Sequence, residues 1–133
     1  MAVEGIDHLA ITVTDMEATV AWYARVLEAE PMYLDRWREG KIPVVLLQVG
    51  RHRLSVHAAA APAKPHAAVP TVGAVDLCFR WSGPLTDAQA RLARLGVAII
   101  EGPVSRPAAN GELGESIYFR DPDGNLLELL SVG

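Results

Sequence analysis

Residues 5–13 read GIDHLAITV, and residues 73–81 read GAVDLCFRW. Each stretch starts with glycine and continues with β-branched and apolar residues, which favours a β-strand. When the first stretch is laid on the second, with an offset of 68 positions, His8 falls on Asp76. The two stretches therefore predict an internal repeat whose copies open with equivalent strands.

A helix is predicted after each opening strand. The spacing of a capping box occurs twice, in Thr14 with Glu17 and in Thr86 with Gln89. The apolar residues that follow recur at helical intervals, as Met16, Val20, Tyr23 and Leu27 in the first copy and Leu85, Ala88, Leu92 and Leu95 in the second. We expect these helices to end at the residues that interrupt them, Pro31 and Gly96.

Three short strands are predicted after each helix. They are expected over residues 32–37, 42–49 and 53–58 in the first copy, and over 97–101, 116–120 and 125–132 in the second. Residues 102–115 are expected to form a polar loop that either covers a substrate or lies open to solvent. Each copy therefore has the order βαβββ.

The repeat predicts one α+β domain over residues 1–133, with two tandem βαβββ modules. Module one extends over about residues 4–58, and module two over about residues 73–132. The segment between them, about residues 59–72, is rich in alanine and proline and is expected to be a linker. If the modules pair about a pseudo-twofold axis, they form a curved mixed sheet around a cavity.

Composition excludes several classes of function. The chain has 12 Lys and Arg against 16 Asp and Glu, so its net charge is -4 and no basic patch for nucleic acid or an anionic membrane is expected. The single cysteine, Cys78, cannot form an internal disulfide, and no apolar stretch is long enough to span a bilayer. Without a recognisable signal peptide, we expect a cytoplasmic protein that acts on a small molecule.

Four residues that can bind a metal recur at matching places. When the last strands are aligned from Gly50 onto Asp121, an offset of 71 positions, His57 falls on Glu128. Together with His8 and Asp76, this makes two pairs of candidate ligands. Imidazole and carboxylate groups suit Fe, Mn, Co, Ni or Zn, and two histidines with one carboxylate leave coordination positions open for a substrate.

Structural roles for the same residues are alternatives. A histidine in a strand often has only a hydrogen-bonding role, although the repeat favours His8 and His57 as ligands. Glu128 lies among leucines, where an unpaired carboxylate is costly to bury, so a ligand role is favoured. Asp76 is expected either to bind the metal or to accept a hydrogen bond from a ligand histidine.

Three motifs give the chain a recognisable resemblance. They are DHLAITV at residues 7–13, WYARVLE at 22–28 and IYFRDPDGNLLEL at 117–129. With the two βαβββ copies, they resemble the vicinal oxygen chelate superfamily, which contains glyoxalase I, extradiol dioxygenases and bleomycin-resistance proteins. The nearest likeness is to small single-domain glyoxalase-like proteins.

The resemblance implies a metal held by His8, His57, Asp76 and Glu128. Members of the glyoxalase type use all four positions. Members of the extradiol type keep a histidine as an acid–base group at the position that His57 has here. Asp76 departs from the pattern, because the metal-dependent enzymes usually have histidine there.

The implied function is a metal-dependent lyase, isomerase or dioxygenase that chelates two adjacent oxygens of a substrate, with Glu128 and His57 as catalytic groups. The alternative is a metal-free protein that binds a drug or another ligand, like the bleomycin-resistance proteins.

Further residues are expected around the cavity and at an interface. Candidate walls of the substrate pocket are Trp37, Arg80, Arg106 and Tyr118. Trp22, Val26 and the exposed strand edges suggest a homodimer, which is common in the superfamily.

Overall fold

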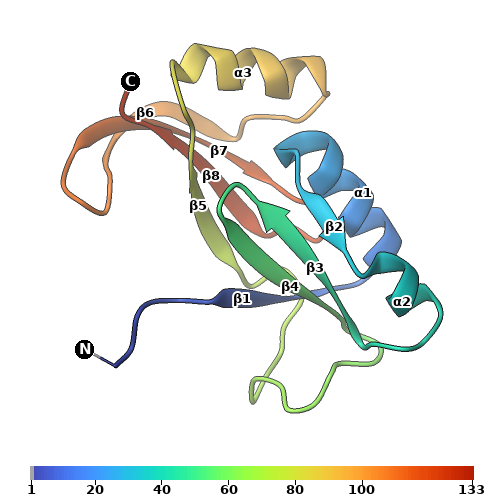
Figure 1. The fold of residues 1–133 in the computed structure, drawn as a ribbon. Helices are drawn as coiled ribbons and strands as arrows, with labels where there is room; N and C mark the ends of the chain where they lie inside the picture. Colours follow the sequence, from blue (N-terminus) through green and yellow to red (C-terminus); the bar gives the residue numbers. More distant parts are fainter. Residues whose placement is uncertain (1) are drawn as a thin grey trace. The chain divides into compact units, whose positions relative to one another are not determined.

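The computed structural model describes residues 2–133 and divides the chain into two compact units (Figure 1). Unit 1 extends to Gly73, and unit 2 begins at Ala74. Each unit has one four-stranded mixed sheet, which confirms the predicted α+β class and its repeat. None of the helices within residues 2–133 is long and apolar enough to cross a membrane.

Unit 1 contains four strands and two helices. In chain order they are β1 (His8–Val13), α1 (Met16–Leu27), β2 (Glu30–Met32), α2 (Leu34–Arg38), β3 (Val44–Val49) and β4 (His52–Ala58). The strand order across the sheet is β1-β4-β3-β2, and β1 runs parallel to β4. Alternating residues of β1, β3 and β4 are buried on one face of this sheet, among them Ile11, Val45 and Val56.

Helix α1 begins one residue later than its capping box predicts. The N-cap is Asp15 instead of Thr14, because the Asp15 carboxylate accepts a hydrogen bond of 3.0 Å from the Ala18 amide. Met16, Val20 and Tyr23 of the predicted apolar stripe are buried, and Val26, which lies outside that stripe, is also buried, at 1% exposure. Val26 therefore fills the core and cannot contribute to a dimer interface.

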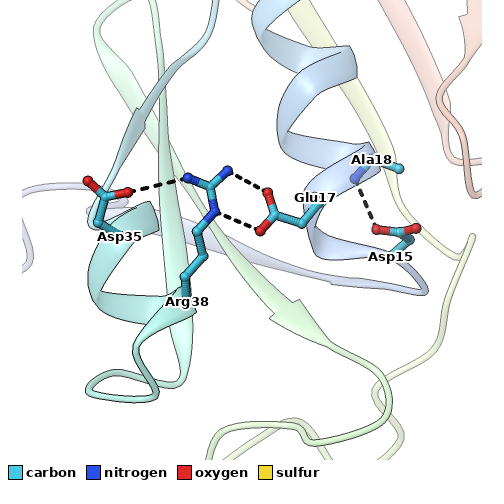
Figure 2. A network of polar contacts seen from close by, with 5 residues as sticks. All are labelled: Asp15, Glu17, Ala18, Asp35 and Arg38. Carbon is cyan, nitrogen blue, oxygen red and sulfur yellow. Dashed lines mark hydrogen bonds and ion pairs between the residues drawn. The ribbon is translucent and has the colours of Figure 1, made fainter.

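A short helix replaces part of a predicted strand. Residues 32–37 were expected to be extended, but Tyr33 has a φ of 68° and ends β2, and α2 follows directly. Arg38 of α2 donates two hydrogen bonds to Glu17 of α1, from Nε at 2.8 Å and from Nη2 at 2.6 Å, and a third to Asp35 at 3.3 Å (Figure 2). This two-point contact holds α2 against α1.

Unit 2 repeats the pattern without a second helix. It contains β5 (Asp76–Arg80), α3 (Leu85–Arg94), β6 (Glu101–Pro107), β7 (Leu113–Arg120) and β8 (Leu126–Ser131). The strand order is β5-β8-β7-β6, with β5 parallel to β8. Helix α3 starts after Pro84 and has no side-chain cap, so the predicted cap at Thr86 is wrong, although Leu85, Ala88 and Leu92 are buried as expected.

Strand β6 lies where a polar loop was predicted. Residues 101–107 pair with β7 in an antiparallel hairpin, and only residues 108–112 remain as its turn. The pairing has an irregularity between Glu101 and Val104. Proline and glycine indicate a loop in most sequence patterns, but they are tolerated at sheet edges and at bulges, so this edge strand was not predicted. Most of the segment that was expected to be a loop, over a substrate or open to solvent, is therefore part of the sheet.

Gly102 is the residue that permits this close pairing. Its φ is 106°, and a Cβ there would collide with the Ser116 carbonyl oxygen and approach Ile117 Cα at 3.0 Å. We predict that Gly102→Ala lowers the free energy of unfolding by about 2–4 kcal/mol, since left-handed strain and backbone overlap add. Gly111→Ala is the control, because Gly111 has a φ of 88° but nothing within 4 Å, and it should cost only about 1 kcal/mol. Urea unfolding that gives equal losses in both variants would contradict the steric argument.

The turn before β8 ties that strand to β5. Asp121 accepts hydrogen bonds from the amide of Asn125 at 2.9 Å and from its side-chain Nδ2 at 2.8 Å. The Oδ1 atom of Asn125 in turn accepts a 2.9 Å bond from the Val75 amide, next to Asp76. Both polar residues are buried and their hydrogen bonds are satisfied. The turn therefore fixes the start of β5 beside β8.

Candidate functional site

In unit 1, His8 and His57 lie on the same face of neighbouring strands. The parallel register pairs His8 with Arg53, Ala10 with Ser55 and Thr12 with His57. Since side chains alternate along a strand, these pairs share one face, opposite the face of Ile11 and Val56. The two histidines therefore share one face of the sheet of unit 1.

His8 has one ring nitrogen in contact with a carboxylate, and within residues 2–133 no hydrogen bond is recorded for the other. Its Nδ1 lies 2.8 Å from a carboxylate oxygen of Asp7, and the side chain of His8 is 51% exposed. A carboxylate on one nitrogen commonly orients a metal-binding histidine through the other. His8 thus has the surroundings of a ligand that would bind through Nε2.

His57 is half-buried and held by a buried serine. Its Nε2 lies 3.2 Å from the Ser55 hydroxyl, and Ser55 is 4% exposed. Burial lowers the pKa of His57, and the electrostatic interactions with His8 and His66 lower it further. The imidazole is consequently neutral at neutral pH, which is the form that binds a metal or accepts a proton.

His66 is a neighbour that sequence analysis does not predict. It lies in the Ala/Pro-rich segment after β4, where its Nδ1 is 2.7 Å from the Ala67 carbonyl oxygen, and it acts electrostatically on His57. An irregular segment has no periodicity, so the sequence contains no signal for the direction of this side chain.

In unit 2, Asp76 and Glu128 share a face of the second sheet. The register pairs Asp76 with Leu126 and Cys78 with Glu128, and on the other side it pairs Glu128 with Tyr118. Asp76 is exposed and Glu128 is half-buried. The two carboxylates therefore stand on adjacent strands, two residues out of step.

Cys78 does not offer a thiolate. Burial and the adjacent Glu128 carboxylate raise the pKa of its thiol to about 12. A protonated thiol is a weak donor and a poor metal ligand. The candidate ligands of unit 2 are thus the two carboxylates.

The predicted pocket walls lie in different surroundings. Arg106 of β6 donates from Nε to the Tyr118 hydroxyl at 3.0 Å, and its guanidinium carbon lies 5.7 Å from the centre of that ring. Burial and the Glu128 carboxylate raise the pKa of Tyr118, so Tyr118 is a neutral hydrogen-bonding group next to Glu128. Arg80, at the end of β5, is exposed on the face of Asp76, whereas Trp37 is half-buried in α2.

The strand registers correct the alignment of the repeat. Counted from His8 and Asp76, the residue of unit 1 that matches Glu128 is Ser55, since Ser55 pairs with Ala10 and Glu128 with Cys78. The alignment that placed His57 on Glu128 is wrong by two positions. The connection between β3 and β4 is shorter than that between β7 and β8, so aligning the turns shifts the strands. A shift of two keeps His57 on the same face.

The donor set of the four residues fits a divalent transition metal. It consists of two imidazoles, from unit 1, and two carboxylates, from unit 2. Within residues 2–133, no three His, Cys, Asp or Glu side chains gather in an arrangement that would hold an ion.

A pocket of unit 2 lies away from these residues. Its volume is about 520 Å³, and it is lined by the first turn of α3, by parts of β6 and β7 and by residues 131–133. None of the predicted site residues lines it. The candidate site therefore consists of residues on the sheet faces and not of this pocket.

Two proteins of known sequence are similar over nearly the whole chain. The virulence protein STM3117 of Salmonella typhimurium is 38% identical over 129 residues, which are 97% of this chain and 85% of that protein. The glyoxalase domain-containing protein RDO1 of Mycosarcoma maydis is 37% identical over 131 residues, which are 98% of this chain and 70% of that protein.

Solved structures share the fold. The crystal structure of STM3117 has a TM-score of 0.87 at 36% identity and covers 98% of both chains. A variant of the fosfomycin resistance protein FosX from Listeria monocytogenes, complexed with Mn(II) and a dihydroxypropylphosphonic acid, has a TM-score of 0.68 at 22% identity, with 97% of this chain and 92% of that chain covered. The model of the Glyoxalase/Bleomycin resistance protein/Dioxygenase superfamily matches residues 5–129, and the chain therefore belongs to this superfamily.

Proposed function

We propose that this protein is a divalent-metal-dependent enzyme that acts on a small substrate with two adjacent oxygens. His8, His57 and Glu128 would hold the metal, with Asp76 as a fourth ligand. The observation that carries the proposal is the repeated pairing of β1 with β4 and of β5 with β8, which gives each unit two candidate ligands on one face. Membership of the superfamily supports the same assignment.

The metal belongs to the class that imidazole and carboxylate groups bind, namely Fe, Mn, Co, Ni or Zn. Mn(II) in the FosX complex is a member of this class. When bound, the metal would act as a Lewis acid that stabilises negative charge on the substrate oxygens, as in an enediolate or a catecholate.

The residues around the metal would handle the proton and the substrate. Glu128 and neutral His57 are the groups suited to accept and return a proton. The walls of the substrate pocket would include hydrogen-bond donors from the sheet of unit 2, namely Arg80, Arg106 and Tyr118. Trp37 would add an apolar surface. This inventory is compatible with a lyase, an isomerase or a dioxygenase.

Metal analysis of protein purified without chelator tests the proposal. We expect about one divalent transition metal per chain after reconstitution. Protein that stays metal-free in the presence of all five metals would instead support the alternative function, a metal-free protein that binds a drug or another ligand.

We further propose a cytoplasmic homodimer, and this makes a prediction about assembly. β1 is an edge strand of its sheet, and Val3, Ile6 and Leu9 on and before it are 77%, 74% and 43% exposed. Exposed apolar residues along a strand edge favour association with a second chain. Light scattering should give about twice the 14.3 kDa mass of the chain.

A pair of identical substitutions locates this interface. Val3→Glu should shift the protein toward the monomer, whereas Val69→Glu, at a residue that is 79% exposed in the linker, should not. A mass of 14.3 kDa for the wild-type protein throughout the micromolar range would reject the dimer.

A further inference from the structure

Ser55 and Glu128 occupy matching places in the two units. Each lies on the last strand of its unit, opposite the residue two positions after the first candidate ligand, Ala10 in one unit and Cys78 in the other. A carboxylate thus stands at this place in unit 2, and a hydroxyl stands there in unit 1.

The ring of His57 extends back to this place. His57 is two residues beyond Ser55, so their backbones are about 7 Å apart along the strand. Yet Nε2 of His57 lies only 3.2 Å from Oγ of Ser55. The imidazole therefore leans along β4 toward the level of Ala10, and so toward His8, whose field lowers the pKa of His57.

We propose that Ser55 is a positioning residue, which holds the His57 imidazole at the place in unit 1 that Glu128 fills in unit 2. His57 donates its Nε2 hydrogen to Ser55, and the lone pair of Nδ1 is left for the metal. This inference rests on the proposed function, since it takes His57 as a ligand. Ser55 and His57 together then replace, in unit 1, the single carboxylate ligand that Glu128 provides in unit 2.

Burial makes Ser55 suited to this role. At 4% exposure its hydroxyl has little access to water, so a hydrogen bond within the protein is strongly favoured. Ser116 is another buried serine on a strand, at 0% exposure, and its hydroxyl has no hydrogen-bond partner within the described residues. Ser116 is therefore a matched control for removal of a buried hydroxyl.

Titration with Co²⁺ tests the proposal. Ser55→Ala should weaken Co²⁺ affinity by about 10- to 100-fold, the usual effect of losing a group that orients a ligand, and should change the visible spectrum of the bound ion. Ser55→Thr, which keeps the hydroxyl, should restore most of the affinity, and Ser116→Ala should bind as the wild type does. Ser55→Ala with wild-type affinity and spectrum would overturn the proposal.

A second measurement needs no metal. Nitrogen-15 NMR of the metal-free protein at pH 8 should show His57 with its hydrogen on Nε2, and Ser55→Ala should give a mixture of the two tautomers. An unchanged tautomer in Ser55→Ala would also overturn the positioning role.

A rescue variant tests the equivalence of the two places. His57→Ala should lose Co²⁺, and adding Ser55→Glu should recover it, because the carboxylate enters the space left by the ring. A folded double variant without Co²⁺ would contradict the equivalence, and if this variant does not fold, the Ser55→Ala and Ser55→Thr pair decides.

His8→Ala in the same titration separates the two proposals. If His8→Ala keeps wild-type affinity, or the wild type binds no Co²⁺, the proposed metal site is wrong. If His8→Ala loses Co²⁺ while Ser55→Ala keeps it, only the role of Ser55 is wrong.

Discussion

Glu128→Ala is expected to leave a folded protein that no longer retains a divalent metal. Glu128 is half-buried on β8 between leucines, and it would be the anionic ligand that unit 2 holds most firmly. His8→Ala is expected to have the same effect, because it removes one of the two imidazoles that the proposal assigns to the metal. Metal analysis after reconstitution should give about one ion per chain for the wild type and none for either variant.

Glu115→Ala is the control for the loss of a carboxylate. Glu115 lies on β7 in the same unit, is exposed and is not a candidate ligand. Its replacement should leave the metal content unchanged, and thermal unfolding should show that all three variants fold. Unaltered metal content in both Glu128→Ala and His8→Ala would remove the basis of the proposed site.

His57→Ala is expected to lower metal affinity by as much as His8→Ala does. Asp76 stands where a second opening-strand histidine would otherwise be, so two imidazoles bind the metal only if His57 joins His8. If His57 served instead as a proton carrier, the metal would remain and turnover would fall by about 100- to 10,000-fold. Side-by-side metal titration of the two variants distinguishes these roles, and wild-type affinity in His57→Ala alone would show the ligand assignment to be wrong.

The pH dependence should follow the lowered pKa of His57. Burial and the electrostatic interactions with His8 and His66 lower the pKa of His57 in the folded protein. In the unfolded chain this pKa has its ordinary value, near 6.5. Protonation therefore favours unfolding, so the stability contributed by neutral His57 is lost as the pH falls below that value. Metal affinity should decline as the pH falls, because a protonated imidazole cannot bind a metal.

The elements with regular patterns could be predicted from the sequence. Alternation identifies β1 and β5, and helical spacing identifies the buried faces of α1 and α3. Alternation also predicts that His57 faces the same side as Ser55, because a strand has a period of two. These features depend only on local order along the chain.

The elements that lack such order could not be predicted. Helix α2 has five residues and none of them is buried, so it has no apolar stripe, and the ion pair of Arg38 with Glu17 that holds it joins distant positions. Strand β6 reads EGPVSRP, a composition typical of a loop.

The two-residue shift between Ser55 and His57 was hidden for a related reason. The connection within the hairpin β3–β4 is shorter than the connection within the hairpin β7–β8. Only the hydrogen-bonded register therefore shows which residues of the two units match. The sequence therefore predicts the face of each candidate ligand but not its level along the strand.

The parallel pairing of the first and last strands of each unit also bears on the order of folding. The hairpins β3–β4 and β7–β8 join neighbouring segments, whereas β1 reaches β4, and β5 reaches β8, only after a long loop closes. Closing a long loop costs entropy before its contacts form, so we expect the hairpins to form before the opening strands dock. His8 and Asp76 consequently join His57 and Glu128 at a late stage, and a chain that has formed only its hairpins lacks the partners to capture a metal ion.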